Sequence, residues 1–301
     1  MKKHFILFLK GMAMGVANVI PGVSGGTIAL ITEIYENLIN SLKSFDLKAF
    51  KLLITFKFKE FVEYTNFYFL AAIFGGSIVS VFSIASLFEY LFDKQEILVW
   101  SFFFGLILAS VYFVGKRIKN WNLINIFALI VGTICAVSLS FIAPASENSN
   151  LFFVFICGIV GISGMMLPGL SGSFILILMG NYKLLMVTAI TELNYLLLFV
   201  FFIGSVFGLM SFSHSISWLL KHYKDATLSI LTGFIIGSLN IIWPWQKCLK
   251  WFNPEQQEKC IESTRYLPEI VNENSLIAFA LIVFGIVVVW ALESFSPNKS
   301  R

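Results

Sequence analysis

The 301-residue chain alternates long apolar runs with short polar connections. Runs that approach the length a bilayer requires, about 20 residues for a helix, cover residues 5–20, 27–42, 67–92, 97–115, 123–143, 151–167, 174–190, 195–220, 227–243 and 275–292. The composition agrees, with 58% hydrophobic residues, 13% charged residues and a mean hydropathy of +0.85. These values are typical of multi-pass membrane proteins. We therefore predict an all-α polytopic membrane protein.

Two of the apolar runs end at the same kind of break. Pro21-Gly22 lies within the stretch 18–27, and Pro168-Gly169 lies within the stretch 164–173, 147 residues further on. Proline lacks a backbone donor and glycine relaxes the backbone, so a Pro-Gly pair ends a helix. Small polar residues follow each pair and favour a new helix start. Each copy predicts a broken helix hairpin, either re-entrant or fully spanning.

The similarity of the two halves extends beyond this motif. Gly105 corresponds to Gly233 and Gly76 corresponds to Gly204, both with an offset of 128 residues. The smaller offset places about nineteen extra residues in the Lys-rich stretch 41–66 of the first half. We predict one membrane domain built from two repeats, residues 1–150 and 151–301, each with one broken hairpin and about three transmembrane helices.

The positive residues predict the orientation of these repeats. The net charge of +4 comes from Lys and Arg in short connections, which favours membrane orientation over nucleic-acid binding as its explanation. With cytoplasmic N- and C-termini, the basic residues at 2–10, 43–59, 116–119, 221–224 and 299–301 fall inside, and the loops 93–96, 143–150 and 244–274 fall outside. Three spans is an odd number, so the second repeat is predicted to be inverted relative to the first.

The four cysteines give two different expectations. Cys135 and Cys157 lie in apolar runs and are expected to be core residues. Cys248 and Cys260 share the loop 244–274, where a disulfide is possible if that loop faces an oxidising compartment. The sequence leaves that disulfide open.

The two breaks are the candidate binding site. A helix N-terminus offers free N–H donors and partial positive charge to an anion. Glycine allows close approach of the backbone, and Ser or Thr adds hydroxyl donors. The candidate phosphate-binding residues are Asn18, Gly22, Ser24, Gly25, Gly26, Thr27, Gly169, Ser171, Gly172 and Ser173. Tight helix packing is the alternative explanation for so many small residues.

An enzymatic alternative is weaker. Gly22, Ser24 and Gly26 match the Gly-x-Ser-x-Gly pattern of serine hydrolases. Such a serine needs a neighbouring base, and His214 is the only histidine within a predicted span. The pattern also requires a preceding strand, which a helical chain lacks. We expect no catalytic residue, no cofactor and no metal site.

A polar stripe follows the first motif. Glu33, Glu36, Asn37 and Asn40 recur at helical spacing, and the last three are expected to reach cytoplasmic water. On a continuous helix Glu33 would lie about 12 Å beyond Gly25. A carboxyl group at that depth could exchange a proton during transport. Glu33 is therefore a candidate for proton coupling.

The doubled Pro-Gly-x-Ser-Gly motif, in the stretches 18–27 and 167–174, resembles a bacterial and archaeal membrane family associated with polyprenyl-phosphate transport. The resemblance implies a translocase in the bacterial cytoplasmic membrane that returns undecaprenyl phosphate from the outer to the inner leaflet for cell-wall synthesis. The lipid substrate and membrane lipids are then its partners, and a homo-oligomer stays open. Ser173 and Phe174 replace Gly26 and Thr27 in the second copy, so we expect unequal contributions from the two copies. The alternatives are a carrier for a small soluble anion (phosphate, sulfate or carboxylate) and a membrane scaffold.

Overall fold

The computed structural model describes residues 2–19, 24–142, 144–251, 260–268 and 273–294. Helices dominate this part of the chain. In chain order the elements are α1 (Lys2–Val19), α2 (Gly25–Ile31), α3 (Tyr35–Lys43), α4 (Leu47–Ile54), α5 (Phe58–Tyr64), α6 (Phe67–Gly115), α7 (Leu123–Leu139), α8 (Leu151–Met166), α9 (Gly172–Leu178), the π-helix η1 (Leu184–Thr188), α10 (Ala189–Thr191), α11 (Tyr195–His222), α12 (Lys224–Ser238), β1 (Gln246–Trp251), β2 (Cys260–Arg265) and α13 (Glu273–Ser294).

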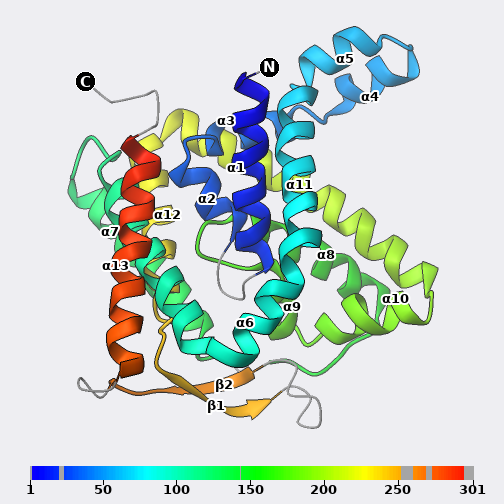
Figure 1. The fold of residues 1–301 in the computed structure, drawn as a ribbon. Helices are drawn as coiled ribbons and strands as arrows, with labels where there is room; N and C mark the ends of the chain where they lie inside the picture. Colours follow the sequence, from blue (N-terminus) through cyan, green and yellow to red (C-terminus); the bar gives the residue numbers. More distant parts are fainter. Residues whose placement is uncertain (1, 20–23, 143, 252–259, 269–272, 295–301) are drawn as a thin grey trace.

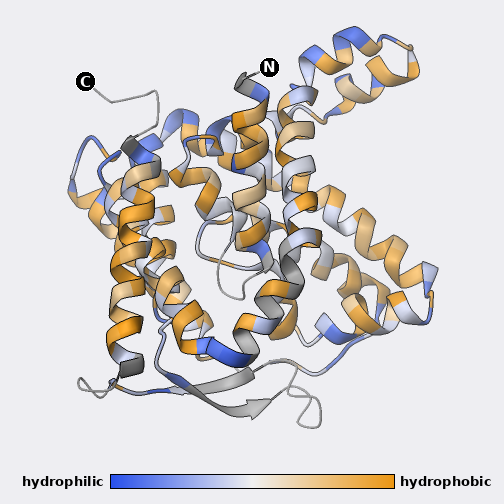
Figure 2. Cartoon of the chain, viewed as in Figure 1, coloured by the Kyte–Doolittle hydropathy of each residue, from blue (hydrophilic) through white to orange (hydrophobic). Residues whose placement is uncertain are grey.

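The long helix α6 is bent and traverses the molecule twice. Its backbone leaves helical geometry at Gln95 (φ −142°, ψ 43°), and Figure 1 shows α6 turning at the bottom of the view. By length and composition, Lys94–Gly115 and Tyr195–His222 can each cross a membrane. A third candidate is the pair Phe58–Tyr64 and Phe67–Ser83, bent by 69°, and Leu123–Leu139, Leu151–Met166 and Ser275–Ala291 are shorter apolar helices. Figure 2 shows hydrophobic residues along these helices and hydrophilic residues at many of their ends.

The prediction of continuous apolar helices after each motif is wrong. The predicted run 27–42 divides into α2 and α3, because Glu33 adopts a left-handed backbone (φ 61°). The run 174–190 divides in the same way after α9, at Gly180 (φ 75°). Each motif therefore leads into a short helix of seven residues that ends at a sharp turn.

Equivalent glycine contacts join the helices of each half. A Cβ on Gly76 of α6 would overlap the carbonyl oxygen of Phe8 on α1, and a Cβ on Gly204 of α11 would overlap that of Phe155 on α8. The helices can approach this closely only because the glycines lack side chains. These contacts pair α1 with α6 and α8 with α11 in the same way.

A second pair of contacts crosses between the halves. Gly105 of α6 packs on the backbone of Ile282 in α13, while Gly233 of α12 packs on the backbone of Leu129 in α7. Gly105 and Gly233 are the residues that the sequence pattern matched with an offset of 128. Helix α6 of the first half thus packs against α13 of the second half, and α12 of the second half packs against α7 of the first half.

These contacts predict opposite outcomes for two neighbouring glycines. Gly76→Ala is expected to destabilise the protein by about 1–3 kcal/mol because the added methyl group overlaps backbone. Gly75→Ala should be neutral or stabilising by up to about 1 kcal/mol, since no atom lies within 4 Å of an added Cβ there. Thermal unfolding of the purified variants measures the difference. Equal melting temperatures for the two variants would contradict the close α1–α6 packing.

The predicted external loop 244–274 contains the only strands among the described residues. β1 and β2 pair antiparallel, with Cys248 opposite Ser263 and Cys260 opposite Trp251. The sequence analysis assigned no strand, so this hairpin is a local exception to the helical prediction. The side chains of Cys248 and Cys260 lie outside the described part, and their disulfide stays untested. Cys157 is buried as expected, whereas Cys135 is exposed.

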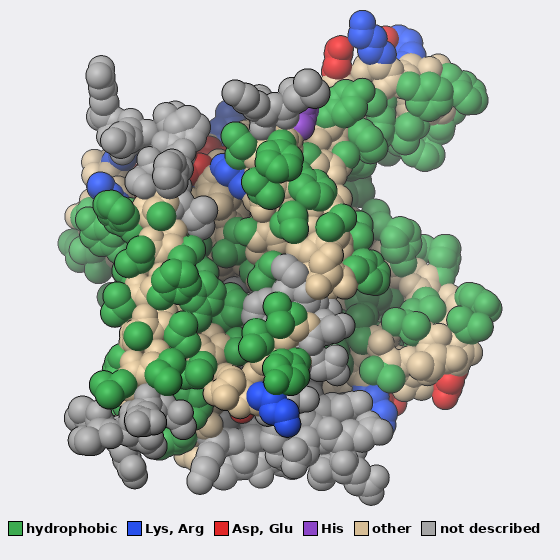
Figure 3. Space-filling model, viewed as in Figure 1, with side chains coloured by type: hydrophobic (Ala, Val, Ile, Leu, Met, Phe, Trp, Pro, Cys, Tyr) green, Lys and Arg blue, Asp and Glu red, His purple; other side chains and the backbone are tan. Residues whose placement is uncertain are grey.

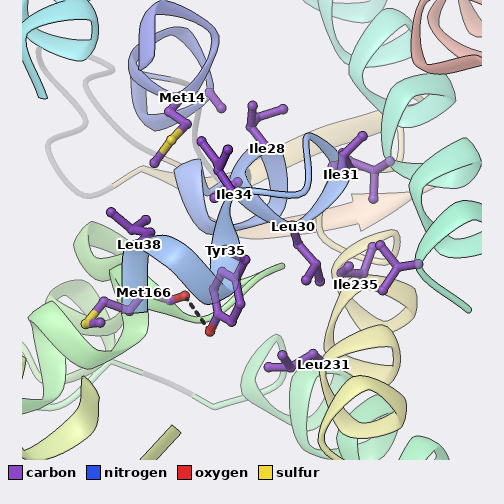
Figure 4. Close-up of a cluster of buried hydrophobic side chains, with 14 of the residues drawn as sticks. Met14, Ile28, Leu30, Ile31, Ile34, Tyr35, Leu38, Met166, Leu231 and Ile235 are labelled. Atoms are coloured by element: carbon purple, nitrogen blue, oxygen red, sulfur yellow. Dashed lines mark hydrogen bonds between the residues drawn. The ribbon is translucent and has the colours of Figure 1, made fainter. Parts of the chain in front are cut away.

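The largest hydrophobic core surrounds α2 and α3. Tyr35 is 2% exposed, and it packs with Ile28, Leu30 and Ile31 against residues of other helices (Figure 4). Those other residues are Met14 of α1, Met166 of α8, and Leu231 and Ile235 of α12. The core therefore places α2, which follows the first motif, directly against the end of α8, which precedes the second motif.

Candidate functional site

Side chains of the first motif cap the N-terminus of α2. Ser24 has an extended backbone (φ −122°, ψ 143°), and its Oγ accepts a hydrogen bond from Thr27 N at 3.3 Å. Asn18 Oδ1, at the end of α1, accepts a hydrogen bond from Gly25 N at 2.7 Å. These two acceptors satisfy N–H groups that a helix start otherwise leaves free.

Direct hydrogen bonds connect the two motifs, although they are far apart in sequence. Ser24 Oγ donates to the carbonyl oxygen of Leu167 at 2.9 Å, and Gly169 N donates to Thr27 Oγ1 at 2.9 Å. The hydroxyl of Tyr35 donates to the carbonyl oxygen of Met166 at 3.3 Å (Figure 4). The two motifs are therefore in direct contact.

Thr27 is fully buried and supplies a single acceptor to the second motif. Thr27→Val keeps the shape of the side chain but leaves Gly169 N–H without this acceptor, which should cost about 1–3 kcal/mol of stability. Thr27→Ser retains the hydroxyl and should lose much less. Thermal unfolding of the two variants provides the comparison. A valine variant as stable as the serine variant would show that this contact contributes nothing.

A cavity of about 300 Å³ opens beside the meeting point of the motifs. The polar side chains in its lining are those of Asn18, Ser24, Ser171, Ser173 and Ser205. The other lining residues are Gly161, Ile162, Met165, Gly172, Leu176, Met186 and Phe201. The volume lies at the lower end of the range for small-molecule sites, about 300–1,000 Å³. The lining residues combine hydroxyl and amide groups with aliphatic and aromatic walls, and they include no ionisable side chain among the described residues.

The cavity brings together half of the predicted site residues, namely Asn18, Ser24, Ser171, Gly172 and Ser173. Gly25, Gly26, Thr27 and Gly169 are not among its lining residues. A Cβ on Gly26 would lie 2.7 Å from the carbonyl oxygen of Met166, so this glycine permits close packing, the alternative role considered for the motif. Gly169 has a left-handed backbone (φ 82°) that favours glycine. Gly22 lies outside the described residues.

Ser205 on α11 lines the cavity but was missing from the predicted site. Its Oγ donates to the carbonyl oxygen of Phe201 at 2.9 Å, within the same helix. The pair Gly204-Ser205 repeats Gly76-Ser77 of the first half. That match indicated a repeated position, but only the folded chain shows that Ser205 lies beside the second motif.

The start of α9 differs from the start of α2. Ser171 occupies the position of Ser24, yet its side chain makes no capping hydrogen bond. Instead Ser171 Oγ lies 2.8 Å from Ser173 Oγ, and either oxygen can be the donor. One of the two hydroxyl hydrogens is used in this bond, so the other is available to an additional acceptor. The Ser171–Ser173 pair thus gives the cavity a hydroxyl donor.

A charged cluster holds the far end of α2. Arg117, just after α6, donates to the carbonyl oxygens of Leu30 (2.8 Å) and Ile31 (3.1 Å). It also forms ion pairs with Glu33 and Glu293, each at 3.3 Å. Cations stabilise the C-terminal carbonyls of a helix.

The sequence analysis placed Glu33 on a continuous helix, and the structure shows that this prediction is wrong. Glu33 occupies the turn after α2, and its exposed side-chain fraction is 24%. Lys10 of α1 reaches the same turn and donates to the carbonyl oxygen of Thr32 at 2.7 Å. Glu33 thus belongs to an ion-pair cluster that also includes Arg117 and Glu293, which the sequence pattern did not connect.

Among the described residues, no histidine forms a hydrogen bond with the Ser24 side chain. His214 is exposed on α11, where its Nδ1 lies 2.9 Å from the carbonyl oxygen of Met210. The Ser24 hydroxyl donates instead to Leu167. A serine nucleophile requires a base within hydrogen-bonding distance, and the described residues supply none here.

Comparisons with known proteins identify the family of this chain. The profile of the family described as undecaprenyl phosphate translocase-like matches residues 14–260. A protein of Vibrio cholerae named polyprenyl-phosphate transporter is 38% identical over 298 residues, covering 97% of this chain and 96% of its own. A Staphylococcus aureus protein of the same name is 31% identical over 259 residues, covering 80% of this chain and 86% of its own. No solved structure matches this chain significantly. This chain is a member of the undecaprenyl phosphate translocase-like family.

Proposed function

We propose that this protein transports a polyprenyl phosphate such as undecaprenyl phosphate, from the outer to the inner leaflet of the bacterial cytoplasmic membrane. Two relatives that cover most of the chain are named polyprenyl-phosphate transporters. A phosphomonoester carries between one and two negative charges near neutral pH. Its passage through hydrocarbon is prohibitive without a polar path. The prenyl tail needs no such path, because it can remain in the lipid.

The observation that carries this proposal is the Ser171–Ser173 pair in the wall of the cavity, where the Ser171 side chain does not cap α9 and the two hydroxyl groups bond to each other. We assign the phosphate to this pair together with Asn18, Gly172 and Ser205. The apolar wall suits the first isoprene units of the tail. A phosphate oxygen would take the free hydroxyl hydrogen and so exploit a donor that the protein leaves available.

Alternating access between two inverted repeats, residues 1–150 and 151–301, is the proposed mechanism. Two observations support it. The left-handed turns at Glu33 and Gly180 are 147 residues apart, the same offset as the Pro-Gly pairs. The ion-pair cluster around Arg117 lies at the C-terminal end of α2. At the end of α9, the carbonyl oxygen of Leu178 instead accepts a hydrogen bond from Ala145 N, in the loop before α8. We propose that α2 and α9 exchange roles in opening the cavity to the two leaflets.

We assign both termini to the cytoplasm. Figure 1 shows α1 beginning and α13 ending at the top of the view, with the strands at the bottom. The basic connections at 43–59 and 116–119 belong to the top end, as cytoplasmic loops should. In this orientation the cluster of Glu33, Arg117 and Glu293 lies toward the cytoplasm. Protonation of Glu33 would weaken its ion pair with Arg117, and we retain it as the candidate for proton coupling.

A proteoliposome assay separates this function from the soluble-anion alternative. Vesicles containing the purified protein and labelled undecaprenyl phosphate should show protein-dependent exchange of the lipid between leaflets, and a large excess of inorganic phosphate should not abolish it. Exchange no faster than in empty vesicles, with saturable uptake of inorganic phosphate by folded protein, would favour the soluble anion. A pH gradient that accelerates exchange in the wild type but not in Glu33→Gln would support proton coupling.

A further inference from the structure

The helices α4 and α5 form an arm that projects from the end of the bundle at which α1 begins (Figure 1). The arm occupies the stretch in which the first half of the chain has about nineteen residues more than the second. It contributes no residue to the cavity or to the cluster around Arg117. Its role is therefore separate from the proposed transport site.

The arm is a folded unit with its own small core. The Asp46 carboxylate accepts hydrogen bonds from two N–H groups of the first turn of α4, at 2.8 and 3.0 Å, and from the Tyr64 hydroxyl at 2.6 Å. Ala49, Leu52 and Phe61 are buried between the two helices. Apolar residues elsewhere on the arm are thus not needed to complete its core.

Six large apolar side chains of the arm remain exposed. Their exposed fractions are 84% for Leu47, 61% for Phe50, 40% for Leu53, 60% for Ile54, 77% for Phe56 and 56% for Phe58. Leu47, Phe50 and Ile54 on α4 follow the spacing i, i+3 and i+7, which places them in one stripe along the helix. A contiguous apolar surface of this kind indicates contact with a protein or a membrane.

Charge and position favour the membrane. Hydrophobic side chains gather on the right-hand and lower flank of the arm in Figure 3, while charged side chains gather along its upper side. The exposed lysines of the arm are Lys48, Lys51, Lys57 and Lys59. Such lysines beside an apolar stripe are typical of helices in the head-group region, where their ammonium groups reach lipid phosphates. The apolar surface continues onto exposed Phe67 and Tyr68 at the start of α6.

We propose that the α4–α5 arm lies in the head-group region of the membrane, with Leu47, Phe50, Ile54 and Phe56 among the acyl chains. The lysines then contact lipid phosphates at the surface. The arm sets the depth at which α6 enters the bilayer and holds this end of the bundle at the interface. The inference requires a membrane-inserted chain but does not depend on the transported substrate.

Site-specific fluorescence in the full-length protein tests the arm directly. Cys135, Cys157, Cys248 and Cys260 are first replaced by alanine, and an environment-sensitive probe is attached after Phe56→Cys or Phe50→Cys. The matched control is Glu60→Cys on α5, whose side chain is 59% exposed and paired with Lys57 at 3.0 Å. Each protein is reconstituted into nanodiscs with lipids brominated on the acyl chain, and iodide serves as the aqueous quencher.

The expected result is strong quenching of the Phe56 and Phe50 probes by brominated lipid with little effect of iodide, and the reverse at Glu60. Equal iodide access at Phe56 and Glu60 would overturn the proposal. Protection from both quenchers, accompanied by cross-linking of two copies through the introduced cysteine, would also overturn it and assign the arm to an oligomer interface. Two independent probe positions on the apolar flank keep the test valid if one variant fails to fold.

Discussion

Replacing Ser171 and Ser173 together with alanine is expected to slow polyprenyl-phosphate transport by about 10- to 100-fold. The pair contributes the hydroxyl donor that the cavity leaves available. A hydrogen bond to a charged group contributes about 1.5–3 kcal/mol, and each 1.4 kcal/mol corresponds to a tenfold change. The two serines make no capping hydrogen bond to α9, so the variant should fold normally. Initial rates of leaflet exchange in proteoliposomes measure the effect.

The matched control for this variant is Ser163→Ala on α8. Ser163 Oγ donates to the carbonyl oxygen of Ile159 within its own helix at 2.7 Å, and Ser163 does not line the cavity. The control should transport at the wild-type rate. Single replacements of Ser171 and Ser173 should be milder than the double replacement, because each retains one hydroxyl. Wild-type transport by the double variant would exclude this pair from phosphate binding.

Arg117→Met is the second change with a large expected effect. Arg117 binds the last carbonyls of α2 and pairs with Glu33 and Glu293, so the substitution removes a cation that both carboxylates share. Loss of one partner from a buried ion pair costs about 3–5 kcal/mol. Because the Arg117 side chain is 22% exposed, we expect the lower end of that range. The melting temperature should fall, and transport should fall with it because α2 is no longer held at its end.

Lys116→Met is the appropriate comparison, since Lys116 precedes Arg117 directly and is exposed. It should leave both the melting temperature and the transport rate unchanged. Adding Glu293→Gln to Arg117→Met should recover part of the lost stability by removing one unpaired carboxylate. If Arg117→Met unfolds at the same temperature as Lys116→Met, the cluster does not stabilise α2.

The parts of the fold that local chemistry determines were predictable from the sequence. Helix α1 ends at Val19 and α8 ends at Met166, shortly before the Pro-Gly pairs of the two motifs, as the missing proline donor predicted. The family resemblance carried by these two motifs is confirmed by the comparisons. The end of α2 was not predictable in this way. A left-handed backbone is uncommon for a glutamate, so Glu33 gave no signal by itself. The available indication was Gly180, which lies 147 residues after Glu33, the same offset as that between the two Pro-Gly pairs.

Long-range contacts set the rest of the site and lay beyond local patterns. The hydrogen bond from Ser24 to Leu167 joins residues 143 positions apart, and the ion pair between Arg117 and Glu293 joins residues 176 positions apart. No helical periodicity connects such positions. The same limitation applies to Ser205, which reaches the cavity because close packing at the neighbouring Gly204 brings α11 against α8.

The most direct test of the proposed site is an experimental structure of the full-length protein in nanodiscs with bound undecaprenyl phosphate. We predict that the phosphate lies within hydrogen-bonding distance of Ser171 or Ser173, with the first isoprene units against Phe201 and Met186. A phosphate bound instead beside Arg117 and Lys10, with the cavity empty, would contradict the assignment and make the charged cluster the binding site.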